Sequence, residues 1–488
     1  MSKRLENPEL PPGAIVETFK DGGARRNDGV MLTPASQNPW YVLATVAGEQ
    51  EGDDIDPDLH AKNRRFWNGW MCQEMEAGER AALAETLGLP EAELKPLTSE
   101  EVKAVSVRFS AAFPDEAPKE MIPKRDVRAD FRHVYFRDSF ILMKFCFVGD
   151  TSFHSAHFAK CANFHEAFFG NTAYFQHTHF SENGDFKNAR FNQGVFFYCA
   201  NFMGSASFQR ANFDKLTRFQ KASFAKPAHF QKSEFLGGSD FQETQFRSGA
   251  SFRETYFTEY AYFQKAQFHW LVDFSNSKMA ARTVFDDTIF DDVVPRFFHC
   301  EMNQDTSFTD DPKLWPEVTL KNAKVGKRAY TRLRQVAAEI YDPDLEHFFL
   351  RQEMRCKARI EWDKGAWFHW LFFEAYRVIA DSGISVARPF WLLVFAWAFG
   401  FACFAGHFDS GILPELPEDI QDSRYWAAAG VSFGNLFGFL GINRLYFTDL
   451  LRDHSPDGLQ LVAGAQTVAG VVLLFFLGLG LRNRFRLK

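Results

Sequence analysis

Few side chains in this 488-residue chain have the type and spacing to do chemistry, and the first candidates are histidines 22 residues apart. His157 and His179 each precede a Phe, and His177 and Cys199 have the same separation. Imidazole and thiolate groups held side by side can bind a metal ion such as Zn²⁺. No third and fourth ligand accompany either pair, and histidine is common on polar surfaces. We therefore predict no metal site and no cofactor.

Catalytic motifs give no stronger candidate. The sequence contains neither the GxxxxGK[ST] loop that cradles phosphates nor the HExxH pair of zinc proteases. The seven cysteines are scattered without a CxxC pair, which is typical of a reducing compartment. We name no catalytic or cofactor-binding residue and do not expect an enzyme.

A regular spacing of Phe organises the middle of the chain, which has 57 Phe but only 12 Tyr and 11 Trp. From Phe131 to Phe290 these residues follow one another in alternating steps of five and six, with Leu142 and Met279 as single replacements. A less regular tail continues to Phe308. A small residue, most often Ala, lies two positions before most of the Phe. Side chains two apart share one face of a strand, so both should point inward.

A right-handed coiled coil has an eleven-residue period as well. However, a step of five turns a helical side chain by about 140°, so alternate Phe would lie on nearly opposite faces. Abundant Asn, Gly, Ser and Thr also oppose a long helix. The pattern therefore favours strands.

Segments such as Ala200-Asn201-Phe202 and Ala211-Asn212-Phe213 give residues 131–308 a resemblance to the pentapeptide-repeat family. The resemblance implies a mainly β fold, a right-handed, four-sided β-helix with the Phe and the small residue inside every face. The family's spacing is a strict five, so the alternation here predicts one extra residue on two faces and a coil of 22 residues. Residues 131–308 should then form about eight coils.

Outward residues 22 apart agree with this coil length, because they should stack about 4.8 Å apart. Gln220, Gln242 and Gln264 should form an amide ladder. In the next column Lys221 and Glu243 begin an alternation of charge that continues through Lys265 and Asp287.

Residues 1–130 are expected to be mainly helical and to cap the first coil, because an open solenoid end exposes strand edges. Thr98 and Glu101 form a capping box before a helix whose apolar stripe is Val102, Val105, Phe109 and Phe113. The segments 38–45 and 60–70 look like stretches of uncharacterised bacterial pentapeptide-repeat proteins. Within the second segment, we expect Trp67 and Trp70 to pack in a core.

Residues 309–388 are basic and helical, with a helix restart at Asp342-Pro343. This juxtamembrane region could meet anionic lipid headgroups, cap the second solenoid end, or do both.

Residues 389–488 are predicted to form a membrane domain. The stretches 389–408 and 458–481 lack Asp, Glu, Lys and Arg and are long enough to span a bilayer. The connecting residues 409–457 hold three Arg against eight acidic residues, so the positive-inside rule predicts cytoplasmic N- and C-termini and a multi-pass inner-membrane protein. The first thirty residues show no signal-peptide pattern.

Residues 425–441 are apolar but short and rich in Gly, which favours a re-entrant segment over a third span. Two spans around such a segment are similar to the pore module of two-helix potassium channels. The Thr-Val-Gly-Tyr-Gly filter has no counterpart in residues 433–441, so we do not expect selective potassium conduction.

Charge narrows the function. Some pentapeptide-repeat proteins imitate DNA with an acidic surface, whereas residues 131–308 hold 18 acidic and 18 basic residues. Residues 131–230 have a net charge of +5 and residues 231–308 one of −5. We therefore expect a membrane-anchored scaffold with a protein partner, with a second copy of the chain as a further candidate and no nucleic acid. The alternative is a channel-like protein regulated by the solenoid.

Overall fold

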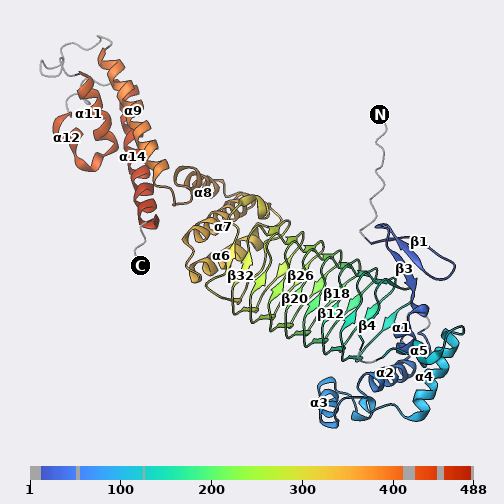
Figure 1. Cartoon of the computed structure of the whole chain (residues 1–488). Coiled ribbons are helices and arrows are strands. Elements are labelled where there is room, and N and C mark those ends of the chain that lie inside the picture. The colour runs from blue at the N-terminus through green and yellow to red at the C-terminus, as the bar shows by residue number, and fades with distance from the viewer. Residues whose placement is uncertain (1–12, 51–54, 125–126, 410–423, 448–455, 485–488) are drawn as a thin grey trace, which may run out of the picture. The chain divides into compact units, whose positions relative to one another are not determined.

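The computed structural model describes residues 13–50, 55–124, 127–409, 424–447 and 456–484 (Figure 1). The chain divides into two compact units, each described here by itself. Unit 1 comprises Met1–Glu317 and Arg332–Glu346, and unit 2 comprises Val318–Thr331 and His347–Lys488.

A parallel β-solenoid forms the body of unit 1 and confirms the predicted fold, with about eight turns. Its short strands, from β4 (Ala129–Asp130) to β35 (Ser307–Phe308), stack into four sheets, one per face. The strands of one coil are β8 (Thr151–Ser152), β9 (His157–Phe158), β10 (Ala162–Asn163) and β11 (Phe168–Phe169). Ala162, Gly184, Ala206, Ala228 and Ala250 pair in one column, which confirms the 22-residue coil.

The core is a set of Phe stacks that run along the solenoid. Phe219 is fully buried, with its ring parallel to those of Phe197 and Phe241 at centroid distances of 4.7 and 5.0 Å. Phe208 and Phe230 meet the same ring edge-on at 5.2 and 5.5 Å. Both geometries are favourable for aromatic pairs, so each ring adds specific contacts to its hydrophobic burial.

The corners between faces are of two kinds, which explains the alternation of five and six. In the five-residue step from Phe153 to Phe158, Ser155 is left-handed with φ 55°, and Ala156 N–H donates to Phe153 O at 2.9 Å. Such a left-handed residue recurs every eleven positions from His133 to Asp287 and once more at His299. The six-residue steps place their additional residue at the other two corners. The last coil is one residue longer, because Phe285 pairs with Phe308.

The N-terminal region adds three strands and five helices to the solenoid. β3 pairs in parallel with β5 (Val134–Phe136), so the hairpin extends one solenoid sheet. The capping box is confirmed, since Glu101 N–H donates to Thr98 Oγ1 and Thr98 N–H to Glu101 Oε2. The elements are β1 (Ile15–Thr18), β2 (Ala24–Arg26), β3 (Met31–Pro34), α1 (Pro39–Ala44), α2 (Pro57–Met71), α3 (Ala77–Leu87), α4 (Ser99–Ala112) and α5 (Pro118–Met121).

Helix α2 closes the first coil. Trp67 is fully buried against Phe131, Phe145 and Phe147, and its Nε1–H donates to Cys146 O at 2.8 Å. Asn68 accepts a hydrogen bond from Cys146 N–H at 2.8 Å. Apolar core and backbone groups at this end are therefore covered together, as a solenoid end requires.

The last coil is covered in a similar way. Trp315 lies over Phe290 at a centroid distance of 4.9 Å. Arg332, on α6 (Ala323–Glu339), donates to the carbonyl oxygens of Phe297 and Cys300. Helix α7 (Pro343–Asp363) begins where predicted, with Leu345 N–H donating to Asp342 Oδ1 at 2.9 Å.

Unit 2 contains two helices that are long and apolar enough to cross a membrane, Ala387–Phe408 and Asp457–Asn483. Only 22% of the most apolar window of each is buried, whereas a core helix of a soluble protein is mostly buried. Between them α11 has 13 residues, about 20 Å of helix against roughly 30 Å of hydrocarbon. The helices are α8 (Trp367–Ala380), α9 (Ala387–Asp409), α11 (Arg424–Leu436), α12 (Ile442–Tyr446) and α14 (Asp457–Arg484).

Candidate binding groove

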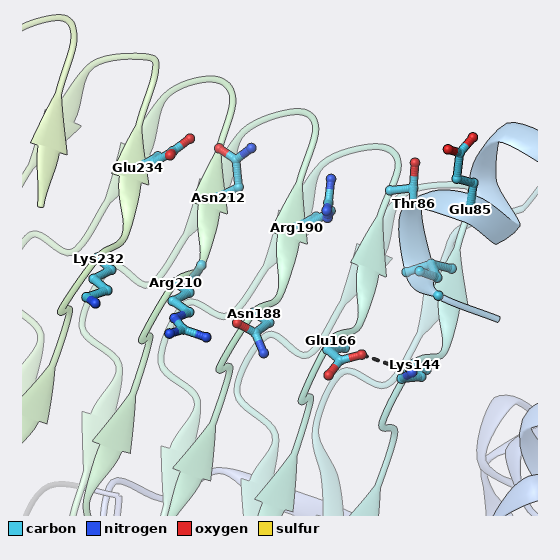
Figure 2. Close-up of a pocket in the computed structure, with 13 residues that line it drawn as sticks. Glu85, Thr86, Lys144, Glu166, Asn188, Arg190, Arg210, Asn212, Lys232 and Glu234 are labelled. Carbon is cyan, nitrogen blue, oxygen red and sulfur yellow. Dashed lines mark ion pairs between the residues drawn. The ribbon is translucent and has the colours of Figure 1, made fainter.

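A groove in unit 1 lies between the end of α3 and one edge of the solenoid, with a volume of about 680 Å³ (Figure 2). Two rows of side chains line its solenoid side. The first row consists of left-handed corner residues on successive coils, and the second consists of strand residues that precede an inward Phe. The corner row is Lys144, Glu166, Asn188, Arg210 and Lys232, and the strand row is Arg190, Asn212 and Glu234.

The solenoid backbone fixes both rows. A left-handed corner residue projects outward, and the residue before an inward Phe points away from the core because strand side chains alternate. Arg190 pairs in register with Asn212, and Asn212 with Glu234. Neighbouring members of a row are therefore one strand spacing apart, about 4.8 Å.

Positive charge in this groove is only partly neutralised. Lys144 forms an ion pair with Glu166 at 3.1 Å, and Lys232 forms one with Glu254 at 3.3 Å. Within the part of the chain that the structure describes, the guanidinium groups of Arg190 and Arg210 have neither an ion pair nor a hydrogen bond.

A second hollow of about 390 Å³ adjoins the first, and Arg210 and Lys232 line both. It adds Lys187 and Arg253, whose side-chain cations are also unpaired among the described residues, and the amides of Gln209 and Gln231. Four unpaired cations and several amides on one edge can bind carboxylates or phosphates, since Arg offers paired N–H donors to both.

The histidines raised by the sequence lie elsewhere, under the N-terminal hairpin. His157 and His179 are neighbours, as the 22-residue period predicts, with stacked rings 4.5 Å apart. Arg26 of β2 lies beside them and donates to His177 O at 3.1 Å. Burial, with smaller contributions from His179 and Arg26, lowers the pKa of His157 to about 3.

These histidines are buried parts of the packing. The described residues contain no group of three or more His, Cys, Asp or Glu that could hold a metal ion. His177 contacts the rings of His154 and Tyr198, and Cys199 lies half-buried on the next coil.

Acid should destabilise the N-terminal end of unit 1. Burial, and then Arg64, lowers the pKa of His60 to about 4, and His60 Nε2 bonds Met143 O at 3.1 Å. Because the folded-state pKa values of His60 and His157 lie below the unfolded value of about 6.5, the unfolded chain binds protons first. Stability should thus be full above pH 6.5 and fall between pH 6.5 and 5, as measured by thermal melts.

Carboxylates remain mostly ionised in this pH window, so it isolates the histidines. His60→Gln keeps a donor for Met143 O but does not titrate, and it should lose less stability than the unaltered chain. Equal losses in both would contradict the assignment to His60.

One catalytic spacing does occur in unit 2. Gly430-Val431-Ser432-Phe433-Gly434 has the GxSxG form of a nucleophile elbow, which requires a sharp strand-to-helix turn. Here it lies inside helix α11, and the buried Ser432 donates its hydroxyl to Trp397 O at 2.7 Å. The geometry therefore gives Ser432 a packing role.

Sequence reasoning named no residue of the groove. Its one signal was the net charge of +5 over residues 131–230, which includes Lys187, Arg190 and Arg210. The position of α3 beside these coils, which completes the groove, carried no signal in the sequence.

Four sheets of two-residue strands, wound around stacked Phe and capped at both ends, define a quadrilateral β-solenoid with an outward polar surface. Residues 146–198, 200–245 and 230–278 match the family model described as Pentapeptide repeats (9 copies). The solenoid is thus a pentapeptide-repeat domain. No curated protein and no solved structure matches the chain.

Proposed function

We propose that this chain is a membrane-anchored interaction module. Two helices of unit 2 anchor it in the inner membrane, and the pentapeptide-repeat solenoid binds an acidic segment of a protein partner from the cytoplasm. The observation that carries the proposal is the groove, where Lys187, Arg190, Arg210 and Arg253 lie together without an ionic partner in the described chain.

The surface of unit 2 supports the anchor. Phe395 on α9 and Leu461 on α14 are each 75% exposed, and other large apolar side chains along both helices are exposed as well. Water would make such surfaces costly, whereas hydrocarbon would cover them favourably. Arg388 at the start of α9 and Arg482 near the end of α14 lie at span ends, where cations meet lipid headgroups.

A short acidic protein segment fits the groove better than a nucleic acid does. The groove and the adjoining hollow have no aromatic side chain in their lining on which bases could stack. Glu166, Glu234 and Glu254 interrupt the positive edge, which would repel a long polyanion. A few carboxylates can instead pair with individual guanidinium groups.

The test uses the full chain in lipid nanodiscs and a fluorescein-labelled Glu-rich peptide. Arg190→Glu/Arg210→Glu should weaken binding at least about tenfold, because each charged hydrogen bond contributes about 1.5–3 kcal/mol. The matched control, Lys215→Glu/Lys226→Glu, makes the same charge change at other corners and should leave affinity within about twofold of the original. Fluorescence anisotropy gives both dissociation constants.

Two outcomes would count against an acidic protein segment. If the control weakens binding as much as the groove variant, the peptide senses only net charge. If duplex DNA binds more tightly than the peptide and loses affinity in the groove variant alone, the site serves nucleic acid.

The centre of unit 2 favours an anchor over a pore. Gln466 on α14 donates to Ala396 O at 2.8 Å and to Ser432 Oγ at 2.9 Å, and Asn435 donates to Gln466 Oε1 at 3.1 Å. These buried amides join α9, α11 and α14. A conducting path needs polar groups that face water or ions, whereas these donors are satisfied inside the packing.

The anchor also makes a topological prediction. Cationic residues follow the second span and precede the first, so reporters fused at Met1 and after Lys488 should both be cytoplasmic. Paired phosphatase and fluorescent-protein fusions measure this in cells, and a reporter inserted in residues 410–423 should be periplasmic. Termini on opposite sides would make residues 425–441 a third span.

A further inference from the structure

Helix α8 has an apolar face that nothing in unit 2 covers. Trp367 and Phe368 are each 67% exposed, and Leu371, Phe372 and Val378 are exposed as well. At 100° per residue these five side chains share one side of the helix. In water, five large apolar groups on one surface helix would be costly.

The other side of α8 packs within unit 2. Tyr376 meets the ring of Phe476 on α14 at 5.7 Å, and Ile379 packs with Leu393 and Leu473 of the two candidate spans. The polar residues Glu374 and Arg377 pair with each other at 2.6 Å and lie away from the exposed apolar face. The helix is therefore amphipathic, and its packed side and its exposed side are different.

The attachment of α8 places it at one end of the candidate spans. Asn483, near the end of α14, donates to Gly383 O at 2.8 Å. Arg388 N–H, at the start of α9, donates to Ser385 Oγ at 3.2 Å. The segment that leaves α8 thus joins the beginning of one span and the end of the other, the level at which hydrocarbon gives way to headgroups.

We propose that α8 is an in-plane membrane helix whose aromatic face, Trp367, Phe368, Leu371, Phe372 and Val378, inserts into the interface of the cytoplasmic leaflet. The proposal rests on the membrane anchoring of α9 and α14. Trp and other aromatic side chains concentrate at this depth, and an amphipathic helix buries its apolar face between headgroups and acyl chains.

Lipid is favoured over a protein cover because the face continues into other exposed apolar surface. Phe390 and Trp391, on the first turn of α9, are exposed beside the end of α8. The same lipid layer would cover α8 and these residues together. Lys364, just before α8, would face the phosphates.

The experiment places a nitroxide spin label at single cysteines of the full chain in vesicles of phosphatidylethanolamine and phosphatidylglycerol. The partly accessible Cys161, Cys199 and Cys403 are first replaced by Ser. Labels at Phe368→Cys and Phe372→Cys test the apolar face, and His369→Cys tests the opposite side. Phe395→Cys on α9 and Lys226→Cys on the solenoid serve as the lipid and water references.

Collision with oxygen, which enters lipid, is compared with collision with a water-soluble nickel complex. Labels at 368 and 372 should favour oxygen, less strongly than the label at 395, whereas labels at 369 and 226 should favour nickel. Replacing both residues with Cys separately guards against a misfolded variant.

Three other results would overturn the proposal in different ways. If 395 favours oxygen but 368 and 372 favour nickel, α8 is in water while the anchor stands. If 395 also favours nickel, the anchoring itself fails. If 368 and 372 are shielded from both reagents, a protein surface, the solenoid or a second copy, covers the helix instead of lipid.

Discussion

Replacing Phe219 with Ala should lower the free energy of unfolding by about 3–5 kcal/mol, the range for a large aromatic removed from a packed core. The ring is fully buried and touches four other Phe, so neighbouring coils cannot collapse into the cavity without breaking their own stacks. Denaturant melts of the full chain in detergent, followed by circular dichroism, measure the change.

Gln220 provides the matched control, since it is the next residue along the same coil. Its side chain points outward and donates to the carboxylate of Asp240. Gln220→Ala should cost no more than about 1 kcal/mol, the usual contribution of one hydrogen bond. A loss equal to that of Phe219→Ala would mean that the inward and outward faces are wrongly assigned.

Trp67→Ala should have an effect of similar size, about 3–5 kcal/mol, but confined to the first coils. Removing the indole uncovers Phe131, Phe145 and Phe147 and leaves Cys146 O without its donor. Exposed strand edges pair with other chains, so the variant should also aggregate. Light scattering and hydrogen exchange of the first-coil amides measure the two effects.

Trp70 lies three residues further along the same helix and is only partly buried, with one hydrogen bond to Pro123 O. Trp70→Ala should therefore leave the first-coil amides protected. If it opens these coils as much as Trp67→Ala, the helix as a whole matters and Trp67 is no specific cap.

The solenoid could be predicted because one local rule repeats. Each Phe is buried for the same reason, so the period gave the coil length, the inward face and the column neighbours without knowledge of the fold. Side-chain details followed less closely. Gln242 donates to Gln264 Oε1 at 3.2 Å as predicted, and Lys221 reaches Glu243 at 3.8 Å, but Gln220 turns to Asp240.

What depends on contacts between distant segments could not be read from local patterns. On α4 the predicted stripe is only partly correct, because Val105 is fully buried whereas Val102 is 37% exposed. The groove is a stronger case, since it requires α3 to dock beside coils that lie a hundred residues away in sequence. Amide pairing of Asn435 with Gln466 across two helices is equally invisible to a periodicity.

The left-handed corners recur every eleven residues, which is half a coil. An eleven-residue duplication would therefore keep every Phe inward and every corner in its proper place, yet turn all downstream coils by half a rotation about the solenoid axis. A duplication of 22 would add a full coil without any turn. Unequal copying of this repeat thus offers evolution two separate adjustments, one of reach and one of the direction in which the downstream surface faces.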